Sequence, residues 1–293
     1  MPKKRDIKNI FVIKASGKQE PFDPEKIKQT CIRAGATKKL AERIVEKVEE
    51  RLYNGMPTRE ILDIALSILD IEKPNTAIRY DLKSAIMRLG PAGYRFEDFF
   101  AEILREYGYH TKVRQMVAGE CVEHEIDIIA EHAVSSRLIE RPTHARYMVE
   151  LKYHNEQGIW TGLKETLYTY ARYLDLLDGW KAGKCERFDG AWLVTNTKFS
   201  HDAIQYGICK GIKMLGWKYP IGYGIEVMIE KKRLYPITVL RNLRYSEVVA
   251  FSKAGILLVK DLFKYKPEQL NNMSRLGIKR IKEIIAAAEH VVS

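Results

Sequence analysis

The chain has 293 residues, of which 46% are hydrophobic and 30% charged, a globular composition that excludes a disordered or membrane-embedded chain. This length suits two or three domains rather than one compact core. Lysine and arginine outnumber the acidic residues by 49 to 38, and the net charge of +11 favours a polyanionic partner. No membrane-length apolar run and no apolar signal core after Met1 is present, so we expect a cytoplasmic protein without membrane contact.

The first 90 or so residues predict a β-hairpin followed by a small helical bundle. Residues 10–22 place β-prone segments on either side of Gly17, a residue suited to a turn. Asp23 and Pro24 form a helix start, with a capping carboxylate and then a proline where no N–H is needed. Apolar residues at three- and four-residue intervals predict further helices over residues 38–54, 58–71 and 76–88.

The segment from Val12 to Ile27 resembles the ATP-cone, the regulatory nucleotide-binding domain known from ribonucleotide reductases. The resemblance covers about residues 8–95 and implies that ATP or dATP binds as a regulatory ligand. The residues at positions that match the family's contact sites are Lys14, Glu20, Asp23, Lys26 and Thr58. Because no Walker motif is present, we do not expect hydrolysis of the nucleotide.

The family's VxKRDG pattern is altered in this chain. Ala15 and Ser16 stand where the family has arginine and aspartate, which removes one charged phosphate contact and predicts weaker nucleotide binding. The alternative is that Lys14 and Lys26 are surface lysines of a helical bundle that docks another protein.

Gly90-Pro91-Ala92-Gly93 predicts a break, beyond which strands and helices are interspersed. This pattern is typical of an α/β domain with a mixed sheet. The expected strands span residues 109–118, 123–130, 147–153 and 191–195, and the expected helices span 96–106, 160–178 and 200–215.

Two acidic residues and a lysine in these strands suggest metal chemistry. Alternation along residues 146–152 places Glu150 and Lys152 on one face, about 7 Å apart at a rise of ~3.3 Å per residue. Asp127 lies among apolar residues on what should be an adjacent strand, and a carboxylate in such surroundings needs a partner. A divalent cation held by Asp127 and Glu150 would supply that partner, and Lys152 could orient or activate a water.

This order of residues resembles the PD-(D/E)xK core of Mrr-type restriction endonucleases and archaeal Holliday-junction resolvases, over about residues 95–220. The resemblance implies a Mg²⁺- or Mn²⁺-dependent endodeoxyribonuclease. Asp127 and Glu150 would bind the metal, Lys152 would be the catalytic lysine, and Glu97 in the first helix would be an auxiliary acid. Ile126 stands where the family's loosely kept proline would precede the aspartate. By itself the Glu-x-Lys pattern is also typical of a solvated ion pair.

The last segment is strongly basic. Residues 231–293 hold 13 lysines and arginines against 5 acidic residues. Residues 251–290 look like a helix-hairpin-helix module, in which hairpin amides contact a nucleic-acid phosphate. The resemblance implies DNA contacts by Gly277, Lys279, Arg280 and Lys282, with Lys279 in place of the second hairpin glycine. The alternative is a helical lid packed on the nuclease, with a solvated basic face.

The chain is therefore predicted to be a multidomain α+β protein. Residues 1–93 would form an ATP-cone-like helical bundle with a β-hairpin, and residues 94–238 an α/β restriction-endonuclease-like domain with a mixed sheet. Residues 239–293 would form a small helical module. The predicted function is hydrolysis of DNA regulated by an adenine nucleotide, with a homodimer implied by analogy to the resolvases. The alternative is a nucleotide-sensing DNA-binding or regulatory protein that no longer cuts, and cleavage of RNA stays open.

Overall fold

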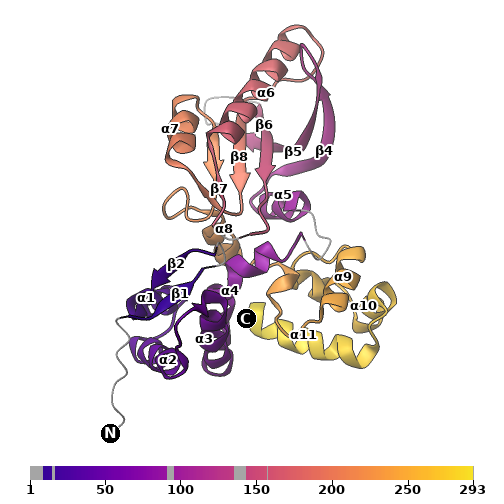
Figure 1. The fold of residues 1–293 in the computed structure, drawn as a ribbon. Helices are drawn as coiled ribbons and strands as arrows, with labels where there is room; N and C mark the ends of the chain where they lie inside the picture. Colours follow the sequence, from indigo (N-terminus) through magenta and orange to yellow (C-terminus); the bar gives the residue numbers. More distant parts are fainter. Residues whose placement is uncertain (1–8, 15–16, 91–95, 135–142, 157, 293) are drawn as a thin grey trace.

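The computed structural model describes residues 9–14, 17–90, 96–134, 143–156 and 158–292. Figure 1 shows a body built around a sheet above two smaller bodies, formed by the N-terminal (indigo) and C-terminal (yellow) parts of the chain. The architecture is a multidomain α+β fold with a mixed sheet, as the sequence predicts in outline. None of the helices in the described ranges is both long and apolar enough to cross a bilayer.

The N-terminal body combines a three-stranded sheet with four helices. β1 (Phe11–Ile13) pairs antiparallel with β2 (Gln19–Pro21) and parallel with β3 (Met56–Pro57), so the predicted hairpin is present. The first helix begins as predicted, because the Asp23 side chain accepts a hydrogen bond from the amide of Glu25 at 3.0 Å. The helices are α1 (Pro24–Arg33), α2 (Lys38–Arg51), α3 (Thr58–Glu72) and α4 (Pro74–Met87).

The central body is a five-stranded mixed sheet in the order β10-β8-β6-β5-β4. β4 (His110–Ala118), β5 (Glu123–Val134) and β6 (Thr143–Lys152) are antiparallel neighbours, whereas β8 (Gly190–Thr195) and β10 (Lys213–Leu215) continue the sheet in parallel. A separate two-stranded ladder joins β7 (Trp160–Thr161) to β9 (Lys198–Phe199). The helices of this body are α5 (Phe96–Glu106), α6 (Leu163–Lys181), α7 (His201–Cys209) and α8 (Ile225–Lys232).

One predicted helix is shorter than expected. The apolar pattern predicts helix over residues 200–215, but α7 ends at Cys209 and the chain then forms β10. Gly211 adopts a φ of 67°, a left-handed conformation that glycine tolerates and that ends the helix. The remaining apolar residues therefore extend the parallel sheet beside β8.

The C-terminal body consists of short helices. They are η1 (Ile237–Val239), α9 (Tyr245–Lys253), η2 (Val259–Lys264), α10 (Pro267–Ser274) and α11 (Ile278–Val292). The predicted breaks at Gly255 and Gly277 are present, and both glycines have positive φ angles, 74° and 86°.

Helix α4 belongs to two hydrophobic cores. Ala77, in its first half, packs in the core of the N-terminal body. Ile86, near its end, packs in a larger core that also holds Val149 of β6 and Phe251 of α9. Residues 91–93 of the predicted break lie outside the described residues, and the larger core holds side chains from both sides of them, such as Ile86 and Phe96.

Replacing Ile86 by alanine tests this shared packing. The side chain is 1% exposed, so we expect the free energy of unfolding to fall by about 2–5 kcal/mol in urea denaturation. Ile71→Ala is the matched control, because Ile71 on α3 is 85% exposed and its loss should change stability by no more than about 0.5 kcal/mol. Equal effects of the two substitutions would contradict the shared core.

Candidate functional site

Asp127, Glu150 and Lys152 lie together where the pairing of β5 with β6 ends. The last paired residues are Ile128 and Val149, so Asp127 and Glu150 are the next residues on the two strands. Asp127 Oδ2 accepts a hydrogen bond from the backbone amide of Leu151 at 2.7 Å. Lys152 Nζ donates to Glu150 Oε1 at 2.7 Å. The structure thus brings together the three residues that the sequence singled out.

The sheet is irregular at Asp127. Ile126 and Ile129 pack in one core and Ile128 in another, which departs from the alternation of a regular strand. On the neighbouring strand β4, Arg114 has a φ of 51°, a strained conformation for a residue with a side chain. Non-glycine residues in such conformations cluster at functional sites, which marks this part of the sheet.

Glu150 is neutralised by two cations from its own chain. Its side chain is almost fully buried, and its Oε2 accepts a hydrogen bond from Arg172 Nη1 of α6 at 2.6 Å. Arg172 also donates to the carbonyl of Glu125 at 2.9 Å and to the hydroxyl of Tyr168. A buried carboxylate needs such partners to offset its desolvation.

Sequence reasoning missed Arg172. The available signal was its helical register, since Arg172 follows buried Thr169 by three residues and precedes buried Leu176 by four. An arginine on the buried side of a helix requires an anionic partner. The identity of that partner, Glu150, depends on how α6 packs on the sheet.

A recess of about 400 Å³ opens beside these residues. Its lining is Glu97, Arg114, Glu125, Asp127, Glu150 and Arg172, so the predicted auxiliary acid Glu97 also lies here. Burial and the nearby charge of Glu150 raise the pKa of Asp127 to about 6, against the opposing effect of the Leu151 amide. Among the described residues Asp127 forms no ion pair, whereas Glu150 forms two.

Metal binding here would rest on few protein ligands. In the described part of the chain, no group of three or more histidine, cysteine, aspartate or glutamate side chains is placed to hold a metal ion. Asp127 and Glu150 nevertheless offer hard carboxylate oxygens, and Mg²⁺ is often bound by one or two carboxylates with water or phosphate. Carboxylate oxygens are donors that Mg²⁺ or Mn²⁺ prefers, but both oxygens of Glu150 are already bonded to Lys152 and Arg172.

The five predicted nucleotide-binding residues lie near one another in the N-terminal body. Glu20, Asp23, Lys26 and Thr58 line a pocket of about 190 Å³ with apolar side chains such as Phe22. Lys14 Nζ lies 2.6 Å from Glu20 Oε2, and Lys26 Nζ lies 3.6 Å from the same oxygen. The hydrogen bond from Lys14 lowers the pKa of Glu20.

The carboxylate of Glu20 therefore pairs with both Lys14 and Lys26. Ala15 and Ser16, the two departures from the family pattern, lie outside the described residues.

The four predicted DNA contacts in the C-terminal body differ in their availability. Arg280 donates to both carboxylate oxygens of Glu247, at 2.7 and 3.0 Å, and to the carbonyl of Asn242. These bonds raise the pKa of Arg280 and join α11 to α9. The amide of Gly277 already donates to Asn271 Oδ1 at 2.8 Å.

The DNA contacts of these four residues therefore stay a prediction. Arg280 and the Gly277 amide are engaged inside the protein because their hydrogen bonds hold neighbouring helices together. Lys279 and Lys282 are exposed and remain available to a phosphate.

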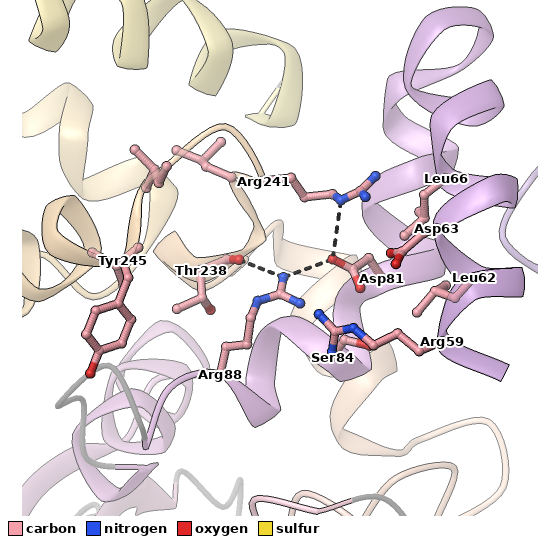
Figure 2. Close-up of a pocket in the computed structure, with 13 residues that line it drawn as sticks. Arg59, Leu62, Asp63, Leu66, Asp81, Ser84, Arg88, Thr238, Arg241 and Tyr245 are labelled. Atoms are coloured by element: carbon pink, nitrogen blue, oxygen red, sulfur yellow. Dashed lines mark hydrogen bonds and ion pairs between the residues drawn. The ribbon is translucent and has the colours of Figure 1, made fainter. Parts of the chain in front are cut away.

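Sequence reasoning also missed a pocket of about 340 Å³ between the N-terminal and C-terminal bodies. Figure 2 shows Asp81 of α4 near its centre, with Arg88 and Arg241 on either side. Asp81 is 2% exposed, and its Oδ2 lies 2.9 Å from Arg88 Nη2 and 4.0 Å from Arg241 Nε. Arg88 also donates to the carbonyl of Thr238 at 2.9 Å, so this cluster ties α4 to the C-terminal body.

Comparisons with known proteins identify two segments of the chain. The ATP cone domain matches residues 10–82, so an ATP-cone is present and indicates nucleotide-sensing regulation. A domain described as AF1548-like, C-terminal, matches residues 235–292.

Two relatives from Archaeoglobus fulgidus and one solved structure are similar to parts of this chain. An uncharacterized protein from this organism is 41% identical over 192 residues, which cover 66% of this chain and 99% of the relative. A second uncharacterized protein from it is 47% identical over 46 residues, covering 16% of this chain and 98% of that protein. The crystal structure of a protein of unknown function, AF1548, matches with a TM-score of 0.53 and 40% identity, covering 67% of this chain and 96% of that one.

The raised pKa of Asp127 gives a prediction for stability. In the folded protein the ionised form is disfavoured, so ionisation costs stability as the pH rises from the usual pKa of 3.8 to about 6. Asp127→Asn removes this cost. We therefore expect the stability of the variant, relative to the parent protein, to rise across this pH range and then to level off.

Urea denaturation at a series of pH values measures this difference. Asp178→Asn is the matched control, because its side chain is 57% exposed on α6 and its replacement removes no buried charge. A constant difference between the Asp127→Asn variant and the parent protein from pH 4 to 7 would contradict the prediction.

Proposed function

The chain belongs to the AF1548-like family and carries an ATP-cone, and from this premise we propose that it is a nucleotide-regulated, metal-dependent nuclease that hydrolyses DNA phosphodiesters. The observation that carries the proposal is that Asp127 and Glu150 line one recess, with Lys152 bonded to Glu150. A strained sheet residue, Arg114, and a carboxylate with a raised pKa at the same place support it.

The residues that line the recess, together with Lys152, suit distinct roles in such a reaction. Asp127 and Glu150 would hold Mg²⁺ or Mn²⁺, and the bound ion would supply an activated water and neutralise phosphate charge. Lys152 holds its ammonium group beside Glu150, where it can offset charge that develops on the phosphodiester. Arg172 orients Glu150, and Glu97 lies close enough to line the same space.

DNA is the proposed substrate because the chain carries a net positive charge and presents lysines at the surface of its C-terminal body. The net charge of the chain is +11, and the C-terminal body presents Lys279 and Lys282 at its surface. Lysines positioned in this way bind phosphates without reading base sequence. A homodimer remains a prediction, which the exposed Leu163, Leu167 and Leu174 on α6 support as a contact surface.

A second function is favoured by one specific observation. Both oxygens of Glu150 are bonded to cationic side chains, so a metal ion would have to compete with Lys152 and Arg172 for this ligand. If those cations are not displaced, the chain would be a nucleotide-sensing DNA-binding or regulatory protein without cleavage.

A cleavage assay separates the two functions. With Mg²⁺ or Mn²⁺ and with duplex, single-stranded and branched DNA, we expect cleavage by the parent protein. Asp127→Ala and Lys152→Ala should each reduce the rate by about 10²-fold or more, because the metal ligand or the compensating charge is lost. DNA binding, measured by fluorescence anisotropy, should stay near that of the parent protein.

Asp178→Ala is the control for this assay, since it removes an exposed carboxylate on α6. Full cleavage by the Asp127→Ala variant would assign the activity to other residues. No cleavage by the parent protein with either metal would support the silent alternative.

The two exposed lysines of α11 give a separate prediction. The double substitution Lys279→Ala with Lys282→Ala should weaken DNA binding and reduce the slope of log affinity against log salt by about 2 units, because each lost phosphate contact removes roughly one. Anisotropy titrations at several salt concentrations measure this slope. Lys47→Ala on α2 is the control, and an unchanged slope in the double variant would make the basic face of α11 a solvated surface.

A further inference from the structure

The nucleotide pocket of the ATP-cone is small for its ligand. Its volume is about 190 Å³, whereas small-molecule sites usually measure roughly 300–1,000 Å³. Apolar side chains including Val12, Phe22 and Ile61 form much of its wall, which suits a base and a sugar rather than a chain of phosphates. A nucleoside triphosphate therefore needs space beyond this pocket.

A second recess adjoins the pocket and provides that space. It measures about 550 Å³ and shares Thr58 and Leu62 with the first pocket. Lys14 lines this recess, and its Nζ lies 2.6 Å from Glu20, which lines the first pocket. A ligand that displaces Glu20 from Lys14 can thus extend from one space into the other.

The recess lies between two bodies of the molecule. Lys14, Arg59 and Arg88 come from the N-terminal body, whereas Asn155 and Glu156 follow β6 of the central sheet. Glu156 is only four residues after Lys152. A group bound in the recess would therefore contact both the ATP-cone and the chain that leaves the candidate catalytic strand.

Arg59 is the unengaged cation of this recess. Arg88 is bonded to Asp81 and to the carbonyl of Thr238, and Lys14 is paired with Glu20. Arg59 is exposed in the first turn of α3 and has no hydrogen bond or ion pair within the described part of the chain. A guanidinium group can bind phosphate through two parallel hydrogen bonds.

The start of α3 adds to the attraction for an anion. Its N-cap residue is Pro57, which makes no side-chain hydrogen bond to the first-turn amides. Free amides at a helix start carry partial positive charge and favour phosphate.

We propose that the phosphate chain of a nucleoside triphosphate passes from the ATP-cone pocket into this recess, where Arg59 binds the terminal phosphate opposite Glu156. This proposal rests on the nucleotide regulation proposed above. It gives the chain a guanidinium contact from α3, although Ala15 has replaced the arginine that the family pattern implies in the hairpin.

In this arrangement a nucleoside triphosphate would affect the protein differently from a di- or monophosphate. Only the terminal phosphate would reach Glu156, and the negative charges of the phosphate and the carboxylate would repel each other. The ligand would then favour an arrangement in which the segment after Lys152 moves away from the cone. A ligand shifts such an equilibrium only if it binds the two arrangements with different affinities. ATP would do so because its terminal phosphate is repelled by Glu156 in one arrangement, whereas AMP has no phosphate at that position.

Calorimetric titration of the full chain with ATP, ADP and AMP, without added metal, tests the proposal. For the parent protein we expect the affinity to decrease in the order ATP, ADP, AMP. Arg59→Ala should weaken ATP binding by about tenfold or more, the effect of one charge-assisted contact, and should leave AMP binding unchanged. Glu156→Gln should tighten ATP binding several-fold by removing the repulsion.

Arg51→Ala is the matched control, since Arg51 is an exposed arginine at the end of α2. ATP binding that is unaffected by Arg59→Ala, or an equal loss for ATP and AMP, would overturn the inference while leaving a nucleotide-binding cone intact. If the parent protein binds no nucleotide, both the inference and the proposed regulation fail.

Discussion

The arrangement of the three bodies depends on the packing of helix α4. Its first half is buried against the ATP-cone, and its second half is buried in the core shared by the central sheet and the C-terminal helices. Its end also carries polar links, because the hydroxyl of Tyr153 donates to the carbonyl of Met87 at 2.7 Å. Arg88, the residue after Met87, donates hydrogen bonds to the Asp81 carboxylate and to the carbonyl of Thr238. Since protein interiors are densely packed, a shift of α4 in one core must also displace side chains in the other core.

This helix connects the two candidate sites. Tyr153 directly follows Lys152, so the end of the candidate catalytic strand is attached to the last turn of α4. The start of α3, which packs on α4, lines the space beside the nucleotide pocket. A nucleotide at the cone and a substrate at the sheet would therefore act on two cores that are joined by α4. Such a physical connection is what coupling between distant sites requires.

Both sites use the same electrostatic arrangement. Glu150 is bonded to Lys152 and Arg172, and Glu20 is paired with Lys14 and Lys26. In each case a carboxylate of the chain balances cations that a phosphate would otherwise meet. Ligand binding then exchanges one set of ion pairs for another, so its net free energy is smaller than the new contacts alone would give.

The sequence by itself determined features that depend on neighbouring residues. The capping carboxylate of Asp23, the turn at Gly17 and the alternation that places Glu150 beside Lys152 act within a few residues, and all three are present in the structure. The grouping of Asp127 with Glu150 rested on the apolar surroundings of Asp127, on the expectation of adjacent strands and on a resemblance. Helix ends were less predictable, because the apolar residues after Gly211 suit a strand as well as a helix.

Only the tertiary structure decided which distant residues meet. Arg172 pairs with Glu150, and Arg280 pairs with Glu247. The recess that joins the cone to the segment after Lys152 depends in the same way on residues from four separate parts of the chain. The physical reason is that helical and strand periodicities specify which face of an element is buried. They do not specify the neighbour against which it is buried, which follows from how all the elements pack at once.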